Sequence, residues 1–108
     1  MIHWPRVQQL RDEVGADEFD EVVRIFLEEV EEVIGRIKAD TGRTGLEQNL
    51  HFLKGGAASL GFQSFADLCQ DGELRAAAGS AQAVDLDAIF EAFRQSRLLF
   101  QTGLQQNS

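Results

Sequence analysis

The sequence has little of several residue types that would point to particular classes of protein. It contains one cysteine, one proline and no tyrosine among 108 residues. Cys69 cannot form an internal disulfide, and we therefore expect a reducing, cytoplasmic compartment. The scarcity of proline, together with abundant alanine, leucine, glutamate and glutamine, favours helix.

Basic residues and long apolar runs are also scarce. Lys and Arg number 10 against 18 Asp and Glu, a formal net charge of −8, which argues against a nucleic-acid partner because phosphate backbones are bound by clustered Lys and Arg. No apolar run approaches the roughly 20 residues of a membrane helix, and residues 1–6 are too mixed for a signal peptide. Without a Gly-rich nucleotide loop, the chain is not expected to use ATP by itself. Numbering from Met1 favours a standalone protein.

Hydrophobic residues at 44% and charged residues at 26% fit one globular domain spanning residues 1–108. Apolar residues recur every three or four positions, which is typical of amphipathic helices. We expect a short helix at 4–14 that ends at Gly15, then a long helix capped by Asp17 with its apolar stripe between Phe19 and Ile37. Four glutamates lie mainly off that stripe, and a solvated face is favoured over a metal cluster because no histidine lies among them: Glu28, Glu29, Glu31 and Glu32.

Three more helices follow. Thr44 with Glu47 matches a capping box, so the next helix is expected at about 44–60, with Gly61 just after its end. Ser64 is expected to cap a helix that has Gly72 as a break or a close contact, and Asp85 to begin the last helix. The core of the helix after Ser64 would contain Phe65, Leu68, Cys69 and Ala76. No segment alternates, and the predicted fold is all-α: an antiparallel up-down four-helix bundle with a short extra N-terminal helix.

The helix at 44–60 carries residues that helix stability alone would not select. At roughly 100° per residue, its large apolar residues share one face and are expected to point into the core: Leu46, Leu50, Leu53, Ala57 and Leu60. His51 lies on the opposite side, with Gly55 and Ala58 around it and Lys54 at the edge.

This arrangement predicts an exposed, phosphorylatable histidine. Gly55 costs about 1 kcal/mol of helix stability relative to Ala, a loss that makes sense if another protein must approach the backbone beside His51. Imidazole is a competent nucleophile, and Lys54 can place a compact positive charge on phosphate oxygens. Gly56 lies on the other flank, where we expect close packing against a neighbouring helix. The alternatives are a histidine without a role and close packing at Gly55 as well.

The run His51-Phe52-Leu53-Lys54-Gly55, followed by small residues and then Leu60-Gly61, resembles the signature of histidine-containing phosphotransfer (HPt) domains. The resemblance extends over essentially the whole chain. It implies an antiparallel four-helix bundle whose histidine accepts a phosphoryl group from a receiver-domain aspartyl phosphate and passes it to another receiver. By position, His51 would be phosphorylated, Lys54 would stabilise the phosphate and Gly55 would leave room for the partner. Leu50 replaces the frequent Ala before the histidine, and Gly56 replaces a frequent Ser.

The resemblance also implies partners: response-regulator receiver domains and a hybrid sensor histidine kinase. It implies a phosphotransfer intermediate with no kinase activity, cofactor or metal of its own, Mg²⁺ being expected on the receiver, and a monomer. We expect docking through residues near the histidine and on the short N-terminal helix: Gln48, Phe52, Ala58, Phe62, Trp4, Val7 and Leu10. Phe52 and Phe62 are expected to point partly outward, while Trp4 could equally cover the end of the bundle.

Three other functions are open at this point. The chain could be a helical adaptor in which His51 is incidental. It could instead be a phosphatase, in which His51 or Gln48 assists hydrolysis of a receiver's aspartyl phosphate. Metal or haem binding through His51 and His3 has weak support, because two histidines and one cysteine far apart in sequence lack the spacing of a known site.

Overall fold

The computed structural model describes residues 2–106, which are almost entirely helical. The elements in order are α1 (Trp4–Val14), α2 (Ala16–Ala39), α3 (Leu46–Leu60), α4 (Gln63–Ala77), the 3-10 helix η1 (Ala81–Ala83) and α5 (Leu86–Gln106). Within residues 2–106 there is no β-strand, only an isolated bridge between Ile2 and Phe62. The all-helical prediction is therefore confirmed.

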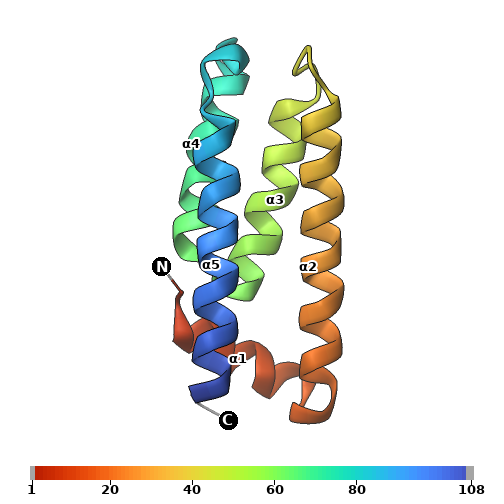
Figure 1. Ribbon diagram of the computed structural model, residues 1–108, viewed down its shortest axis with the longest axis vertical. Helices are drawn as coiled ribbons and strands as arrows, with labels where there is room; N and C mark the ends of the chain where they lie inside the picture. Colours follow the sequence, from red (N-terminus) through yellow and green to blue (C-terminus); the bar gives the residue numbers. More distant parts are fainter. Residues whose placement is uncertain (1, 107–108) are drawn as a thin grey trace.

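The molecule is elongated, with extents of 43 × 20 × 19 Å. Figure 1 shows α2, α3, α4 and α5 running along the long axis, each in the opposite direction to the one before it, while α1 crosses the end where α2 begins and α5 ends. Helix α3 packs against α2 and α4, and α4 packs against α5. None of the helices in residues 2–106 has the length and apolar character that crossing a membrane requires.

The limits of α1 match the prediction, because Pro5 suits a first helical turn and Gly15 leaves the helix with φ +89. The cap predicted for α2 is wrong. Helix α2 begins at Ala16, so Asp17 lies inside its first turn together with Glu18. The helix dipole stabilises carboxylates at this end of a helix.

The start predicted for α3 is also displaced. The helix begins at Leu46 instead of near Thr44, and no side chain caps it at its N-cap residue Gly45. The carboxylate of Asp40 accepts hydrogen bonds from the Thr44 amide at 3.3 Å and the Gly45 amide at 2.9 Å. Asp40, at the end of α2, thus bonds the two amides that immediately precede α3, and it does not bond the first-turn amides that the Thr44 side chain was expected to cap. The other end is as predicted, since Gly61 adopts the left-handed conformation with φ +79.

Helix α4 begins at Gln63, one residue before the cap predicted at Ser64. Phe65 and Cys69 are buried as predicted, but Leu68 is 37% exposed and is not a core residue. Its position lies at the edge of the buried stripe. Gly72 does not break the helix: it is a close contact, since a Cβ there would lie 2.9 Å from Leu50 Cδ1.

Aromatic side chains pack together in the core around the turn between α3 and α4. Phe62 packs edge-on against Phe100, with ring centroids 5.2 Å apart, and Phe65 lies 5.2 Å from Phe93. Trp4 stacks on Phe100 at 6.0 Å. Helix α5 begins where predicted, because the Asp85 carboxylate accepts a hydrogen bond from the Ala88 amide at 3.1 Å.

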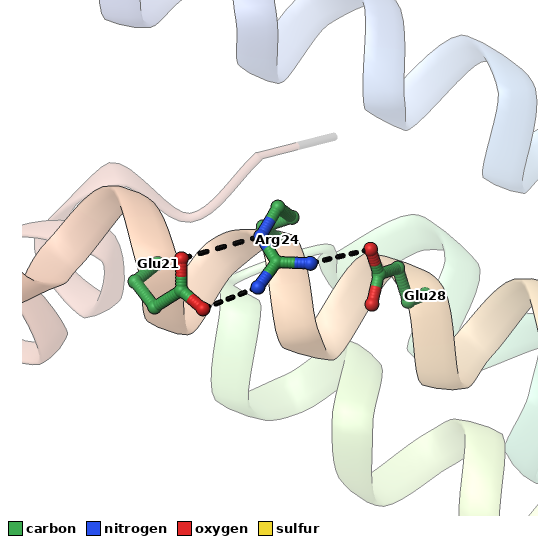
Figure 2. Close-up of polar contacts among 3 residues, drawn as sticks. All are labelled: Glu21, Arg24 and Glu28. Carbon is green, nitrogen blue, oxygen red and sulfur yellow. Dashed lines mark hydrogen bonds and ion pairs between the residues drawn. The ribbon is translucent and has the colours of Figure 1, made fainter.

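The outward face of α2 is acidic and solvated. Figure 2 shows Arg24 between two carboxylates of this face, bonded to Glu21 one turn before it and to Glu28 one turn after it, the latter at 2.6 Å. Glu31 pairs with Arg97 of α5. The described residues contain no group of three or more His, Cys, Asp or Glu side chains able to hold a metal ion.

Candidate functional site

His51 projects from the middle of α3 into solvent. Its side chain is 68% exposed, while the five apolar residues predicted to face the core are at most 1% exposed: Leu46, Leu50, Leu53, Ala57 and Leu60. The predicted division of α3 into a core face and an exposed face that carries His51 is therefore confirmed.

A carboxylate from the neighbouring helix holds the histidine. Nδ1 of His51 lies 2.8 Å from Oε2 of Glu73 on α4, and Nζ of Lys54 lies 2.9 Å from Oε1 of the same carboxylate. Glu73 is only 19% exposed, against 32% for Lys54. The Glu73 carboxylate, the most buried of the three groups, therefore links His51 to Lys54.

The charge of Glu73 selects the proton position on the ring. Its ion pair with Lys54, helped by the hydrogen bond from His51, lowers the pKa of Glu73 against the opposing effect of burial. An ionised carboxylate can only accept hydrogen bonds, so the contact requires a hydrogen on Nδ1. A neutral ring then has its lone pair on Nε2, the nitrogen that is not bonded to Glu73.

The two glycines of α3 differ in their surroundings. A Cβ built on Gly55 would meet nothing within 4 Å, so no contact with residues 2–106 requires glycine there. A Cβ on Gly56 would lie 3.7 Å from Val30 Cγ2 of α2, which is ordinary van der Waals contact. Gly56 therefore faces the neighbouring helix as predicted, but the approach is not close enough to require glycine.

A groove of about 650 Å³ lies between α3, α4 and the start of α1, and its α3 wall begins one turn after His51. Lys54, Gly55 and Ala58 form its α3 wall, Ala66 and Gln70 belong to its α4 wall, and Arg6 and Gln9 of α1 close one side. The Arg6 guanidinium is fixed there by donating to the Ser59 carbonyl at 3.2 Å. Small side chains next to a fixed cation leave room for part of another molecule.

Comparison with known proteins decides the family. The family model for the Hpt domain matches residues 21–105, most of the chain, including the helix that carries His51. The chain belongs to the Hpt domain family. No curated protein and no solved structure matches it.

Hpt domains act as histidine phosphocarriers in the phosphorelays of two-component signalling, where they interact with receiver domains and kinases. A general role in phosphoryl transfer follows for this chain. The resemblance seen in the sequence motif is confirmed by this match.

The structure corrects several docking residues expected for this Hpt domain. Phe62 is fully buried, contrary to the expectation that it points outward, because the turn between α3 and α4 directs it between Phe93 and Phe100. Val7 and Leu10 are 4% and 5% exposed and pack into the core, since they form the inner face of α1. These three side chains offer no surface to a partner.

The other expected docking residues lie at the surface. Phe52 is 48% exposed, and Gln48 and Ala58 are exposed too. Trp4 is half-buried, and its indole stacks on Phe100 and lies against Gly103, so it covers the end of the helices.

Two residues, one bonded to His51 and one lining the groove, were not expected from the sequence. Glu73 lies 22 residues after His51 on another helix, and its only signal was its place on α4 beside the buried residues Cys69 and Gly72. Arg6 gave no sequence signal as a wall of the groove.

Cys69 is not a second nucleophile. Burial, with a smaller contribution from the negative charge of Glu73, raises the pKa of its thiol to about 12. The thiol is therefore protonated at neutral pH.

Proposed function

We propose that His51 is the phosphorylated residue of this Hpt domain, accepting a phosphoryl group from a receiver-domain aspartyl phosphate and giving it to another receiver. The observation that carries the proposal is the state of the imidazole: its Nδ1 is bonded to Glu73 at 2.8 Å, while the side chain is 68% exposed, so Nε2 is the nitrogen left for a partner. An exposed nitrogen lone pair at a fixed position is what attack on phosphorus needs.

Lys54 is the phosphate-stabilising cation in this proposal. It is anchored by Glu73 at 2.9 Å, next to His51, and its ammonium group can place positive charge on the transferred oxygens. Gly55 provides clearance, because a partner can approach the backbone where no side chain projects. We infer that α2 to α5 form the antiparallel up-down four-helix bundle expected of the family, with α1 as the extra N-terminal helix.

The proposed partners are response-regulator receiver domains and a hybrid sensor histidine kinase. We propose that the domain is a monomer and that it binds these partners in the cytoplasm. Docking would use Gln48, Phe52 and Ala58 together with the groove beside them. Mg²⁺ would be held by the receiver's own acidic residues, and this chain would supply the nucleophile and one cation. It is a carrier without kinase activity of its own.

Transfer of labelled phosphate tests the proposal. A receiver domain from the same genome is phosphorylated with ³²P, purified and mixed with the wild-type chain or with His51→Gln. We expect acid-labile label on the wild type and none on the variant. Label that never leaves the receiver would favour a helical adaptor, and label released as free phosphate without appearing on the chain would favour a receiver phosphatase. Either result would contradict the carrier.

A further inference from the structure

The groove between α1, α3 and α4 has a cation, Arg6, that the proposed chemistry at His51 does not use. Arg6 lies on α1, and its side chain is 27% exposed. Its Nε donates to the Ser59 carbonyl of α3 at 3.2 Å, and its Nη1 donates to Oε1 of Gln9 at 3.0 Å. The guanidinium is therefore held in place before any partner arrives.

The bonds of Arg6 within the chain leave several of its donors unused. A guanidinium has five N–H groups in a planar fork. Within residues 2–106, Nη2 forms no hydrogen bond or ion pair, and Nη1 has one further contact, with the Glu13 carboxylate at 3.6 Å. That contact is longer than the roughly 2.7–2.9 Å of a charge-assisted hydrogen bond. The remaining N–H groups suit a carboxylate, whose two oxygens match the fork.

The charges that line the groove favour an acidic partner. The whole chain has 18 acidic against 10 basic residues, yet the described lining of the groove contains Arg6 and Lys54 against a single carboxylate, that of Asp67. Lys54 is already paired with Glu73 at 2.9 Å. No ion pair joins Arg6 to Asp67 within residues 2–106. Arg6 is thus the cation of the groove that is available to a carboxylate from another molecule.

The position of Arg6 separates it from the reacting atoms. Its anchor Ser59 follows His51 by eight residues on α3, which is about 12 Å along the helix axis at roughly 1.5 Å per residue. Gly55 and Ala58, two small residues that line the groove, lie between these positions. A partner that reaches His51 across them therefore brings a second part of its surface, away from its phosphorylated aspartate, against Arg6.

We propose that Arg6 is a specificity-determining residue, which binds a carboxylate on the surface of the receiver domains that exchange phosphate with this chain. The inference rests on the proposed function of His51. The carboxylate lies outside the receiver's phosphorylation pocket, so it takes no part in the transfer and decides which receivers dock well. Because Ser59 and Gln9 already hold the guanidinium, the pair forms with little further loss of side-chain freedom.

Transfer rates measured against receiver concentration test this role. A receiver from the same genome that labels the wild-type chain is compared on the wild type, Arg6→Gln and Arg6→Lys, each shown to be folded by urea denaturation. In Arg6→Gln we expect the half-saturating receiver concentration to rise about tenfold or more, because hydrogen bonds to a charged group are lost. The rate at saturation should stay within about twofold, as expected when only docking is weakened. Arg6→Lys, which keeps the charge without the fork, should fall between the two.

Arg11→Gln is the matched control. Arg11 carries the same charge on the same helix, but its guanidinium lies over the Phe19 ring and outside the groove. Its half-saturating concentration should equal that of the wild type. Equal values for Arg6→Gln and the wild type, or equal rises in Arg6→Gln and Arg11→Gln, would overturn the inference and leave the carrier function standing. So would a lower saturating rate of Arg6→Gln with unchanged half-saturation, the result of a purely structural role.

A charge exchange identifies the group on the receiver. Arg6→Glu should dock poorly with the natural receiver, whose surface Asp and Glu residues outside the phosphorylation pocket are replaced by Arg one at a time. We expect one such receiver variant to restore transfer with Arg6→Glu while docking poorly with the wild-type chain. A complete set of receiver variants that restores nothing would overturn the inference. A wild-type chain that no receiver labels would instead contradict the carrier function itself.

Discussion

At the scale of single residues, the site depends as much on an absent side chain as on those present. Gly55 lies in the middle of α3, where glycine costs about 1 kcal/mol relative to alanine. No packing contact offsets this cost, since a Cβ at Gly55 would meet nothing within 4 Å among the described residues. Under the proposed function the reason is external: glycine leaves the backbone beside His51 open to the partner.

Replacing Gly55 by glutamine should therefore separate folding from transfer. We expect the free energy of unfolding to rise by about 0.5 kcal/mol, from the better helix propensity. Phosphoryl transfer from a receiver should slow by about tenfold or more, because misplacement of reacting groups by about 1 Å can cost about a hundredfold. Urea denaturation and the rate of label transfer measure the two effects.

Gly35 of α2 offers a matched control. It is also an exposed helical glycine whose Cβ would meet nothing within 4 Å, but it lies outside the site. Gly35→Gln should gain similar stability and transfer normally. If Gly55→Gln transferred as fast as Gly35→Gln, the clearance argument would be wrong.

The sequence was sufficient to place the candidate residues that lie on one helix. His51, Lys54 and Gly55 are fixed relative to one another by helix geometry, and the core face of α3 is set by its leucines. Glu73 was beyond reach, because its contact depends on how α4 is rotated against α3 and on the register between them. A pattern of 3.6 residues gives the buried face of each helix but not which side chains meet across two helices.

At the scale of helices, glycine has a different role where α4 meets α3 and the segment leading into α5. A Cβ on Gly72 would lie 2.9 Å from Leu50 Cδ1 and 3.2 Å from Val84 Cγ1. Glycine at this position lets the backbone of α4 approach the core closely. Glycine is a weak helix former, but the close packing around position 72 leaves no room for a Cβ.

Two alanine substitutions test this difference between glycines. Gly72→Ala should lower the free energy of unfolding by about 1 to 3 kcal/mol, the usual range for overpacking a core. Gly56→Ala, whose Cβ would have an ordinary contact with Val30, should be neutral or raise it by up to about 1 kcal/mol. The comparison requires urea unfolding curves with equal slopes. Equal effects of the two substitutions would show that the spacing of α4 is not set by Gly72.

Helix boundaries were predictable only where local chemistry was unambiguous. Pro5 and Gly15 defined α1, and Asp85 defined the start of α5, as observed. The starts of α2, α3 and α4 differed by one or two residues from the predicted caps. Several polar residues compete near each start, and at α3 the carboxylate of Asp40 reaches in from the preceding helix.

At the scale of the whole molecule, α1 closes the end of the long helices. The His3 amide donates to the Gly61 carbonyl at 2.7 Å, and Trp4 stacks on Phe100 while lying against Gly103. The first turn of α1 is thus attached to the turn after α3 and to α5. This attachment also places Arg6 beside the groove.

Trp4→Ala should therefore act on stability and not on transfer. We expect the free energy of unfolding to fall by about 2 kcal/mol, below the range for a fully buried tryptophan because Trp4 is half-buried. Trp4→Phe, which retains a ring over Phe100, should lose less. At temperatures where each variant is folded, label transfer should stay within about twofold of the wild type. Normal stability with slow transfer would instead identify Trp4 as a docking residue.

The docking surface was the least predictable part of the molecule. Apolar residues near the site can either meet a partner or complete the core, and their spacing is the same in both cases. Val7, Leu10 and Phe62 belong to the core, because α1 and the turn after α3 are folded against the long helices. Only the assembled molecule separates them from the exposed Phe52.

Locating the phosphoryl group tests the central claim most directly. The chain has two histidines, and both are exposed. The wild type, His3→Gln and His51→Gln would each be phosphorylated by a receiver and fragmented in a mass spectrometer under neutral conditions. We expect one phosphoryl group on His51 in the wild type and in His3→Gln, and none in His51→Gln. Phosphate on His3, or on His51→Gln at the wild-type level, would contradict the account.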